Sequence, residues 1–380
     1  MPVYVLWHHS CTLTVQLIHR STEPISMNVP KQTHDSGSRT DLKILLALLT
    51  LLLIGSPGAS AGKRRSPAGG ERDRAAAAAN GQALIWRQPE NISSRDLFWG
   101  PGGKEHAPRG VFTFVKEDMN GTNPKFDVTD QDGVRWKVKM GVEARSENAA
   151  DRIVWAAGYF TNEDYFVAHL DVRGMPARLH RGWKMVGPNG QVRNVRLKRE
   201  TKNEKKLGDW QWRNSQFTGS PEWNGLRVMM ALINNWDLKD VNNAIYQRKD
   251  GDRIFLVSDL GASFGAAGRT WPTWKAKDDF DSFSRSKFIL RVNTGAVDFA
   301  TPARPNWKIA VNPRSYFSRI RMEWIGRGVP IGDVRWIANI LSRLSPQQIC
   351  DAFRASGYSP DEVQAFAGVV EQRIAALKRL

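Results

Sequence analysis

Cysteine and histidine are scarce in this sequence, and each shortage excludes a class of site. Of the two cysteines, Cys11 lies within the N-terminal segment that we expect to be removed, so Cys350 has no internal partner for a disulfide. Of the 7 histidines, those beyond residue 62 are far apart in the sequence: His106, His169 and His180. We therefore expect no zinc site built from clustered histidines.

A long hydrophobic run is also missing. A membrane-spanning helix needs about 20 apolar residues, whereas the apolar run "ILLALLTLLLI" covers only residues 44–54. Basic residues precede it and Ala59-Ser60-Ala61 follows it, which is the layout of a secretory signal peptide. We expect residues 1–61 to be a signal peptide cleaved near Ala61, with export to the periplasm or beyond and no stable transmembrane span. The run lies far from Met1, so Met27 is an alternative start, and an uncleaved anchor is the alternative to cleavage.

Acidic residues are outnumbered. The sequence has 38 Asp and Glu against 55 Lys and Arg, which gives a formal net charge of +17. A basic surface attracts polyanions such as nucleic acid, anionic lipid or nucleotide phosphates. The alternative is a solvated basic surface without a specific partner. The 380 residues, 41% of them hydrophobic, suffice for one large two-lobed domain or two ordinary ones.

The sequence beyond the signal segment falls into three parts. Residues 62–108 begin as a charged, low-complexity tether and continue as an irregular lead-in. Residues 109–207 hold strand patterns separated by turn signals, namely "VFTFVKED", "KFDVTD", "VRWKVKM", "DYFVAHLDV" and "QVRNVRLKR". Among them, "SENAADRIVWAAGY" predicts a helix over 147–157, capped by Ser146 and ended by Gly158.

Residues 208–380 are predicted to be mainly helical, with a hairpin near their start. Ser220 caps a helix that has Pro221 in its first turn. The turn signal "RKDG" between "AIYQ" and "DRIFLVSD" predicts a β-hairpin. Beyond residue 314 the patterns are helical, and two of them begin with Ser-Pro, a helix-start signal.

Two short motifs flank the predicted hairpin. The stretch "DLKDVN" places Asp237, Lys239 and Asn242 just before it, and "VSDLG" places Asp259 just after it. A hairpin brings the two motifs together. In this order they resemble the catalytic loop and the metal-binding D-x-G of the protein-kinase-like fold. Taken alone, Asp237 and Asn242 are also ordinary residues for a turn at the end of a helix.

The resemblance implies a role for each motif residue. Asp237 would orient the acceptor hydroxyl and accept its proton, and Lys239 would neutralise charge on the transferred phosphoryl group. Asn242 and Asp259 would hold Mg²⁺ or Mn²⁺ bridging the phosphates of ATP.

The same resemblance requires a strand lysine paired with a helix glutamate. Lys139 is the first choice for the phosphate contact, with Glu147 as its partner. Lys137 lies on the same strand face, and Glu143 is the rival acid, so the sequence leaves the register open. "MNGTNPKFDV" occupies the place of the loop that covers the phosphates, and Gly121 is its only glycine.

The departures from the ordinary kinase pattern indicate which relatives to expect. Asn235-Trp236 stands where a His-Arg pair precedes the catalytic Asp, and the sequence has no G-x-G-x-x-G. The chain thus resembles an atypical, exported bacterial member of the protein-kinase-like superfamily, similar to the HipA-type, CotH-type and secreted kinases. The resemblance implies a two-lobed α+β fold. Residues 109–207 would form an N-lobe of antiparallel sheet with one helix, and residues 208–380 a mainly helical C-lobe.

The function implied is an exported, ATP- and divalent-metal-dependent phosphotransferase. Its partners would be a nucleotide and a protein or glycan that offers a hydroxyl group, with no specific nucleic acid. The alternative is a non-catalytic kinase-like binding module, a pseudokinase, at the cell envelope. A polyanion-binding protein that works through its basic surface is a third hypothesis, which strong salt dependence of binding would mark.

Tryptophan is abundant, with 15 residues. "WQW" at 210–212 and "WPTW" at 271–274 are the densest groups. Exposed tryptophans stack on sugars or bases, whereas buried ones pack the core. We expect core packing for most of them, with "WPTW" as the better candidate for a substrate contact because it follows the D-L-G motif.

Overall fold

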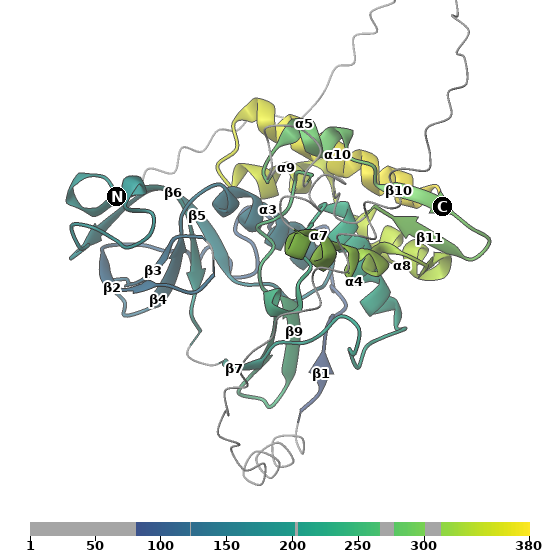
Figure 1. Ribbon diagram of the computed structural model, residues 1–380, viewed down its shortest axis with the longest axis horizontal. Coiled ribbons are helices and arrows are strands. Elements are labelled where there is room, and N and C mark those ends of the chain that lie inside the picture. The colour runs from purple at the N-terminus through teal and green to yellow at the C-terminus, as the bar shows by residue number, and fades with distance from the viewer. Residues whose placement is uncertain (1–80, 122, 202–203, 267–276, 301–312) are drawn as a thin grey trace, which may run out of the picture. The chain divides into compact units, whose positions relative to one another are not determined.

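The structure is a computed structural model that describes residues 81–380 except 122, 202–203, 267–276 and 301–312 (Figure 1). The expected signal segment and the "WPTW" group at 271–274 lie outside the described residues. Within them the chain is a mixed α+β protein. No helix in this part of the chain is long and apolar enough to cross a membrane.

Five strands close into a barrel in the order β2-β3-β4-β6-β5. Their bounds are β2 Phe112–Asp118, β3 Lys125–Thr129, β4 Arg135–Lys139, β5 Asp164–Arg173 and β6 Gln191–Arg199, blue to teal in Figure 1. Alternate residues of β3 and β4, among them Phe126 and Val138, are fully buried in the apolar cluster of these strands. The five strands are the ones that the sequence pattern predicts.

The arrangement of these strands differs from the predicted antiparallel sheet. Neighbours do pair antiparallel, except that β2 pairs in parallel with β5, where Phe112 lies opposite Val172. This pair closes the sheet and leaves no free edge. The prediction missed the closure because alternation along a strand identifies its buried face and not its neighbour.

Helix α3, Glu143–Ala156, packs against β5 and β6 of the barrel. It begins four residues before the predicted start, at Glu143, and Val142 separates it from Gly141, which has a φ of 96°. Ser146 is therefore not its cap, and this prediction was wrong: the hydroxyl is fully buried and donates to the carbonyl oxygen of Gly261 at 2.8 Å. The predicted end is confirmed, since Gly158 follows the helix with a φ of 100°.

A second sheet has the strand order β1-β9-β8-β7. Its strands are β7 Lys205–Gly208, β8 Asn243–Gln247, β9 Arg253–Val257 and β1 Ala83–Leu84. Strands β8 and β9 form the predicted hairpin, with Asn243 opposite Val257. Strand β1 pairs in parallel with β9 and comes from the last two residues of the segment predicted to be a flexible tether, 62–84, so that prediction was wrong for these residues. The end of the predicted tether is thus bonded to the sheet that carries the hairpin.

The rest of the chain is mainly helical, around one large apolar cluster. Its helices are α4 Pro221–Leu232, α5 Phe280–Arg285, α7 Pro313–Ile320, α8 Ile331–Leu341, α9 Pro346–Arg354 and α10 Pro360–Lys378. A small sheet has the order β10 Ile289–Val292, β11 Ala296–Phe299 and β12 Val329–Pro330. Short 3₁₀ turns lie at Trp183–Met185, Pro188–Gly190, Asp240–Asn242 and Glu323–Gly326.

The predicted helix starts are confirmed in this region. The Ser220 hydroxyl accepts from the main-chain N–H of Trp223, three residues into α4. Ser345 and Ser359 each form a reciprocal capping box with the residue three positions on, Gln348 and Glu362. The "WQW" tryptophans are confirmed as core residues, because Trp210 and Trp212 are 4% and 2% exposed.

Candidate functional site

Lys139, the last residue of β4, is the lysine that meets the acids of α3. Its Nζ lies 2.8 Å from a carboxylate oxygen of Glu147, 2.7 Å from one of Glu143 and 3.1 Å from one of Asp259. The predicted contact between a strand lysine and a helix glutamate is therefore present. Both candidate acids take part in it, so the two were not exclusive.

Lys137, the other candidate lysine, has different partners. Its Nζ lies 2.6 Å from Asp118 on β2 and 3.6 Å from Asp127 on β3. Lys137 is thus engaged along the outer face of the barrel, and Lys139 alone of the two reaches α3. The distinction depends on where the helix crosses the strand, which the alternation of residues along β4 does not show.

The ion pairs around Lys139 determine the charge states of Lys139 and Asp259. Burial opposes the charged form of Lys139, but Glu147 and Asp259 outweigh it and raise the pKa of the ammonium. Burial likewise opposes ionisation of Asp259, but the charge and hydrogen bond of Lys139 lower the pKa of that carboxyl. Lysine and aspartate are therefore both charged at neutral pH. Glu143 also binds Asn123 and Lys277, which adds a further positive charge.

Asp259 is held beside Asn242 by the main chain. The N–H groups of Ser258 and Asp259 donate to the carbonyl oxygen of Asn242 at 2.7 and 3.2 Å. The Asp259 side chain is 41% exposed, so solvent reaches its carboxylate next to the buried Lys139. The hairpin therefore brings together the two predicted metal ligands, as the sequence suggested.

The side chain of Asn242 is oriented by the catalytic-loop motif. Its Nδ2 donates to the carbonyl oxygen of Asp237 at 2.6 Å. Among the described residues, no hydrogen bond engages the other terminal atom of this amide. A carboxylate oxygen on Asp259 and a free amide oxygen on Asn242 are ligands that suit Mg²⁺ or Mn²⁺. The donor set fits a divalent ion, although its role as a metal site stays a prediction.

Buried and accessible side chains alternate along the catalytic-loop motif. Trp236 and Leu238 are 6% and 3% exposed, and the N–H of Trp236 donates to the carbonyl oxygen of Ala262 at 3.2 Å. Asp237 and Lys239 alternate with them and contact each other at 2.7 Å, with side chains 25% and 50% exposed. The apolar residues thus anchor the loop to the D-L-G segment and leave the acid and the base accessible.

Gly121 lies in the turn between β2 and β3, with a φ of 70°. Its carbonyl oxygen accepts from Arg181, which also binds the carbonyl oxygens of Asp118 and Asn120. Arg181 comes from the segment between β5 and β6, and sequence reasoning missed it. The turn has a fixed shape because a distant arginine binds three of its carbonyls. Whether Gly121 contacts a nucleotide stays a prediction.

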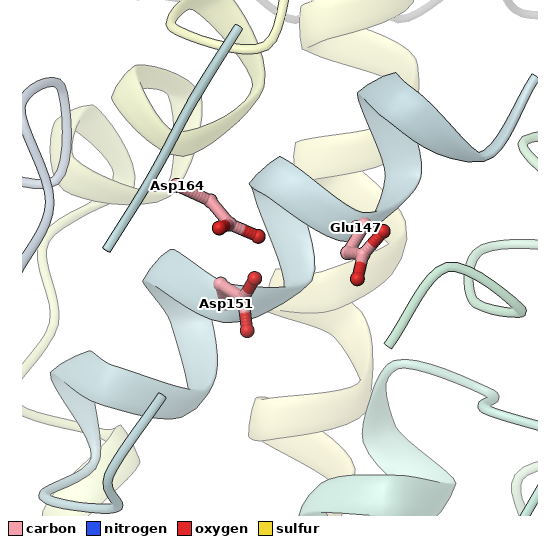
Figure 2. Close-up of side chains that lie close together, drawn as sticks. All are labelled: Glu147, Asp151 and Asp164. Carbon is pink, nitrogen blue, oxygen red and sulfur yellow. The ribbon is translucent and has the colours of Figure 1, made fainter. Parts of the chain in front are cut away.

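A group of buried ionisable side chains, which sequence reasoning missed, surrounds Glu147, the partner of Lys139. Glu147, Asp151 and Asp164 each have a carboxylate oxygen within 4.8 Å of the others (Figure 2). Arg196 on β6 lies among them, 2.6 Å from Glu147 and 3.2 Å from Asp164. Glu143, Glu147 and Asp151 are four residues apart in turn, so they share one face of α3, a spacing that could have revealed the group.

These carboxylates form a different set from the predicted metal ligands. The guanidinium of Arg196 already supplies their positive charge. Burial, with Asp164 and Glu147 adding to it, raises the pKa of Asp151 well above its ordinary value. Asp151 is therefore a neutral acid that can donate its proton to Asp164. The group serves to hold Glu147, and through it Lys139, in place.

Comparisons with known proteins add a structural likeness and no match in sequence. No family model matches the sequence, and no curated protein matches it either. Among solved structures, the chain is similar to the proinflammatory kinase CtkA of Helicobacter pylori, with a TM-score of 0.40 and 11% sequence identity. The match covers 72% of this chain and 97% of the other. A match this weak assigns no family, and the chemistry of the site is what bears on function.

Proposed function

We propose that the chain is an ATP- and divalent-metal-dependent phosphotransferase with a protein-kinase-like, two-lobed arrangement. The observation that carries this proposal is the meeting of Lys139, Glu147 and Asp259, which come from β4, α3 and the end of the hairpin. Asn242 is bonded to the main chain of Asp259 at the same place. A buried lysine–glutamate pair beside an accessible acid and amide suits phosphate and metal binding together.

The donor side of the reaction uses the residues around Lys139. The ammonium of Lys139 would contact the phosphates of ATP, held in position by Glu147. Asp259 and Asn242 would supply oxygen ligands to Mg²⁺ or Mn²⁺, and the ion would neutralise charge on the phosphates. The Gly121 turn would cover the phosphates from the side of β2 and β3.

The acceptor side uses the accessible loop residues. The acceptor oxygen attacks the γ-phosphorus, the bond from that phosphorus to the bridging oxygen breaks, and ADP leaves with the electron pair. Asp237 accepts the proton of the hydroxyl, and Lys239 offsets charge on the transferred group. The acceptor is proposed to be a protein or glycan.

A non-catalytic binding module is the second candidate. The observation that favours it is that Lys139 has three carboxylate partners within 3.1 Å without any ligand. A structural ion-pair network would look the same in this respect. Such a protein would bind a partner at the cell envelope and transfer nothing.

Phosphoryl transfer separates the two candidates. The purified chain is incubated with Mn²⁺ and γ-labelled ATP, alone and with envelope proteins and glycans, and label transfer is measured. We expect Asp237→Asn to lower the transfer rate about 100-fold or more with unchanged thermal stability. The matched control is Asp209→Asn, at an exposed acid that pairs with Lys206 outside the site. ATP binding with no transfer by the wild type would favour the binding module.

We also propose that the protein acts outside the cytoplasm after cleavage near Ala61. Intact-mass measurement on the periplasmic and cytoplasmic fractions tests this. A full-length chain confined to the cytoplasm would contradict it.

A further inference from the structure

Three cations lie in one row across three neighbouring strands. Lys125 on β3 is directly opposite Lys139 on β4, and Lys139 is directly opposite Arg196 on β6. Residues paired in this way project from the same face of the sheet, with Cβ atoms about 5 Å apart. The row therefore extends from the buried carboxylates at Arg196, through Lys139, to Lys125.

The three cations differ in their partners. Arg196 binds Glu147 and Asp164, and Lys139 binds three carboxylates. Among the described residues, no hydrogen bond or ion pair engages the ammonium of Lys125. Asp118 is directly opposite Lys125 on β2, but its carboxylate binds Lys137 at 2.6 Å instead. Lys125 is thus the member of the row with no counter-ion of its own.

The position of this ammonium is defined by the turn above it. A Cβ atom placed on Gly121 would lie 3.5 Å from Nζ of Lys125, so the amine is next to the β2–β3 turn. Lys125 is half-buried. Burial, with repulsion from Lys139 and Lys137, lowers the pKa of its ammonium, while Asp118 and Asp259 oppose the shift. A partly desolvated cation beside two others is stabilised by any anion that binds between them.

We propose that Lys125 is a second phosphate-binding lysine, which with Lys139 holds the polyphosphate of a nucleoside triphosphate beneath the Gly121 turn. The inference rests on the proposed function, because the polyphosphate is that of its donor. Two ammonium groups on adjacent strands match a chain of phosphates better than a single lysine does. The α3 carboxylates compensate one of them, and the ligand compensates the other.

The charges around Lys139 indicate what a second lysine would add. The positive charge of Lys139 is largely cancelled by Glu143, Glu147 and Asp259. A bound polyphosphate would lie close to these acids, so an additional cation beside them favours its binding. Lys125 supplies that charge from the strand next to Lys139, on the side away from Arg196.

Titration calorimetry on the full chain tests the proposal with three probes: tripolyphosphate, ATP with Mg²⁺, and adenosine. Lys125→Met keeps the apolar stem and removes the charge. It should weaken tripolyphosphate and ATP binding at least about tenfold and leave adenosine binding unchanged. Lys125→Arg should stay within about threefold of the wild type, since it restores the charge. The control is Lys116→Met, at an exposed lysine of the same barrel.

The outcomes separate this proposal from the proposed function. Unchanged ATP and tripolyphosphate binding by Lys125→Met, with loss of both by Lys139→Met, would overturn the role of Lys125 and leave the phosphotransferase standing. A second outcome is that the wild type binds tripolyphosphate but not ATP, and that Lys125→Met loses this binding. It would overturn the proposed binding of a nucleotide and leave the phosphate-binding role of Lys125 standing. A wild type that binds none of the probes overturns both. If Lys125→Met does not fold, Lys125→Gln is compared in its place, and a tenfold loss there is the same criterion.

Discussion

The two sides of the candidate site carry similar charges in opposite surroundings. On the α3 side, Glu147 and Arg196 have side chains 1% and 5% exposed. On the hairpin side, Asp237, Lys239 and Asp259 are 25%, 50% and 41% exposed. Charges out of water need partners on every side, whereas exposed charges are solvated and free to exchange partners. The α3 side is thus built to hold a geometry, and the hairpin side is built to meet a ligand.

The largest effect on stability is expected from breaking the buried side. Glu147→Ala removes the acid that binds both Lys139 and Arg196 and leaves two buried cations short of a partner. The free energy of unfolding should fall by about 3–5 kcal/mol. Chemical unfolding measures this, with Glu200→Ala as the control, since Glu200 makes an exposed contact of 3.9 Å with Arg135. A loss below about 1 kcal/mol would mean that the buried network is not what holds α3.

The next largest effect is expected from loss of Asp259, and it should reduce ligand binding much more than stability. Asp259→Ala removes a predicted metal ligand, while Lys139 keeps Glu143 and Glu147 as partners. The unfolding free energy should fall by only about 1 kcal/mol, and the thermal stabilisation by Mn²⁺-ATP should disappear. Differential scanning calorimetry with and without Mn²⁺-ATP reads both quantities. Wild-type stabilisation by Mn²⁺-ATP in this variant would end the metal-site hypothesis.

Acid should weaken a third contact, at the barrel's outer face. Burial opposes ionisation of Asp118, but the hydrogen bond from Lys137 lowers its pKa from 3.8 to about 2. A carboxyl with a lower pKa in the folded state stabilises the fold above its unfolded pKa, and the contribution is lost as the pH falls towards about 2. The stability difference between wild type and Asp118→Asn should therefore be full at pH 6 and shrink between pH 4 and pH 2. A difference that does not change with pH would contradict the ion pair.

The smallest effect on stability is expected at Lys239, on the exposed hairpin side of the site. Lys239 contacts Asp237 at 2.7 Å with half of its side chain in solvent. Lys239→Ala should change the unfolding free energy by less than about 0.5 kcal/mol, because exposed ion pairs contribute little. Phosphoryl transfer, by contrast, should fall clearly in this variant. A marked loss of stability would show that Lys239 is structural.

Much of the site could be anticipated because its parts are close in sequence. The "DLKDVN" motif, the "RKDG" turn and the D-L-G segment lie within one hairpin, so pairing β8 with β9 is enough to bring Asn242 to Asp259. The prediction of a lysine–glutamate contact succeeded for the same reason, since only a short link joins Lys139 to α3. The sequence did not decide between Lys137 and Lys139, because both side chains lie on the same face of β4.

The residues that the sequence did not reveal are far apart in sequence from the partners that they meet in the structure. Arg196, Asp164, Arg181 and Lys125 reach the site from strands and segments whose neighbours the sequence pattern does not specify. The closure of the barrel belongs with them, because it depends on a parallel pair between β2 and β5. Strand β1 was missed because two residues show no periodicity.

The sequence by itself determined the elements whose stabilising contacts are local. Ser220, Ser345 and Ser359 start their helices through bonds to residues three positions on, and the hairpin turn closes within a few residues. Only the tertiary structure decided which charges meet. Lys139 lies between Lys125 and Arg196 because β4 pairs with β3 on one side and β6 on the other. Local bonds follow from neighbouring residues, whereas the energy of a buried charge depends on every element packed around it.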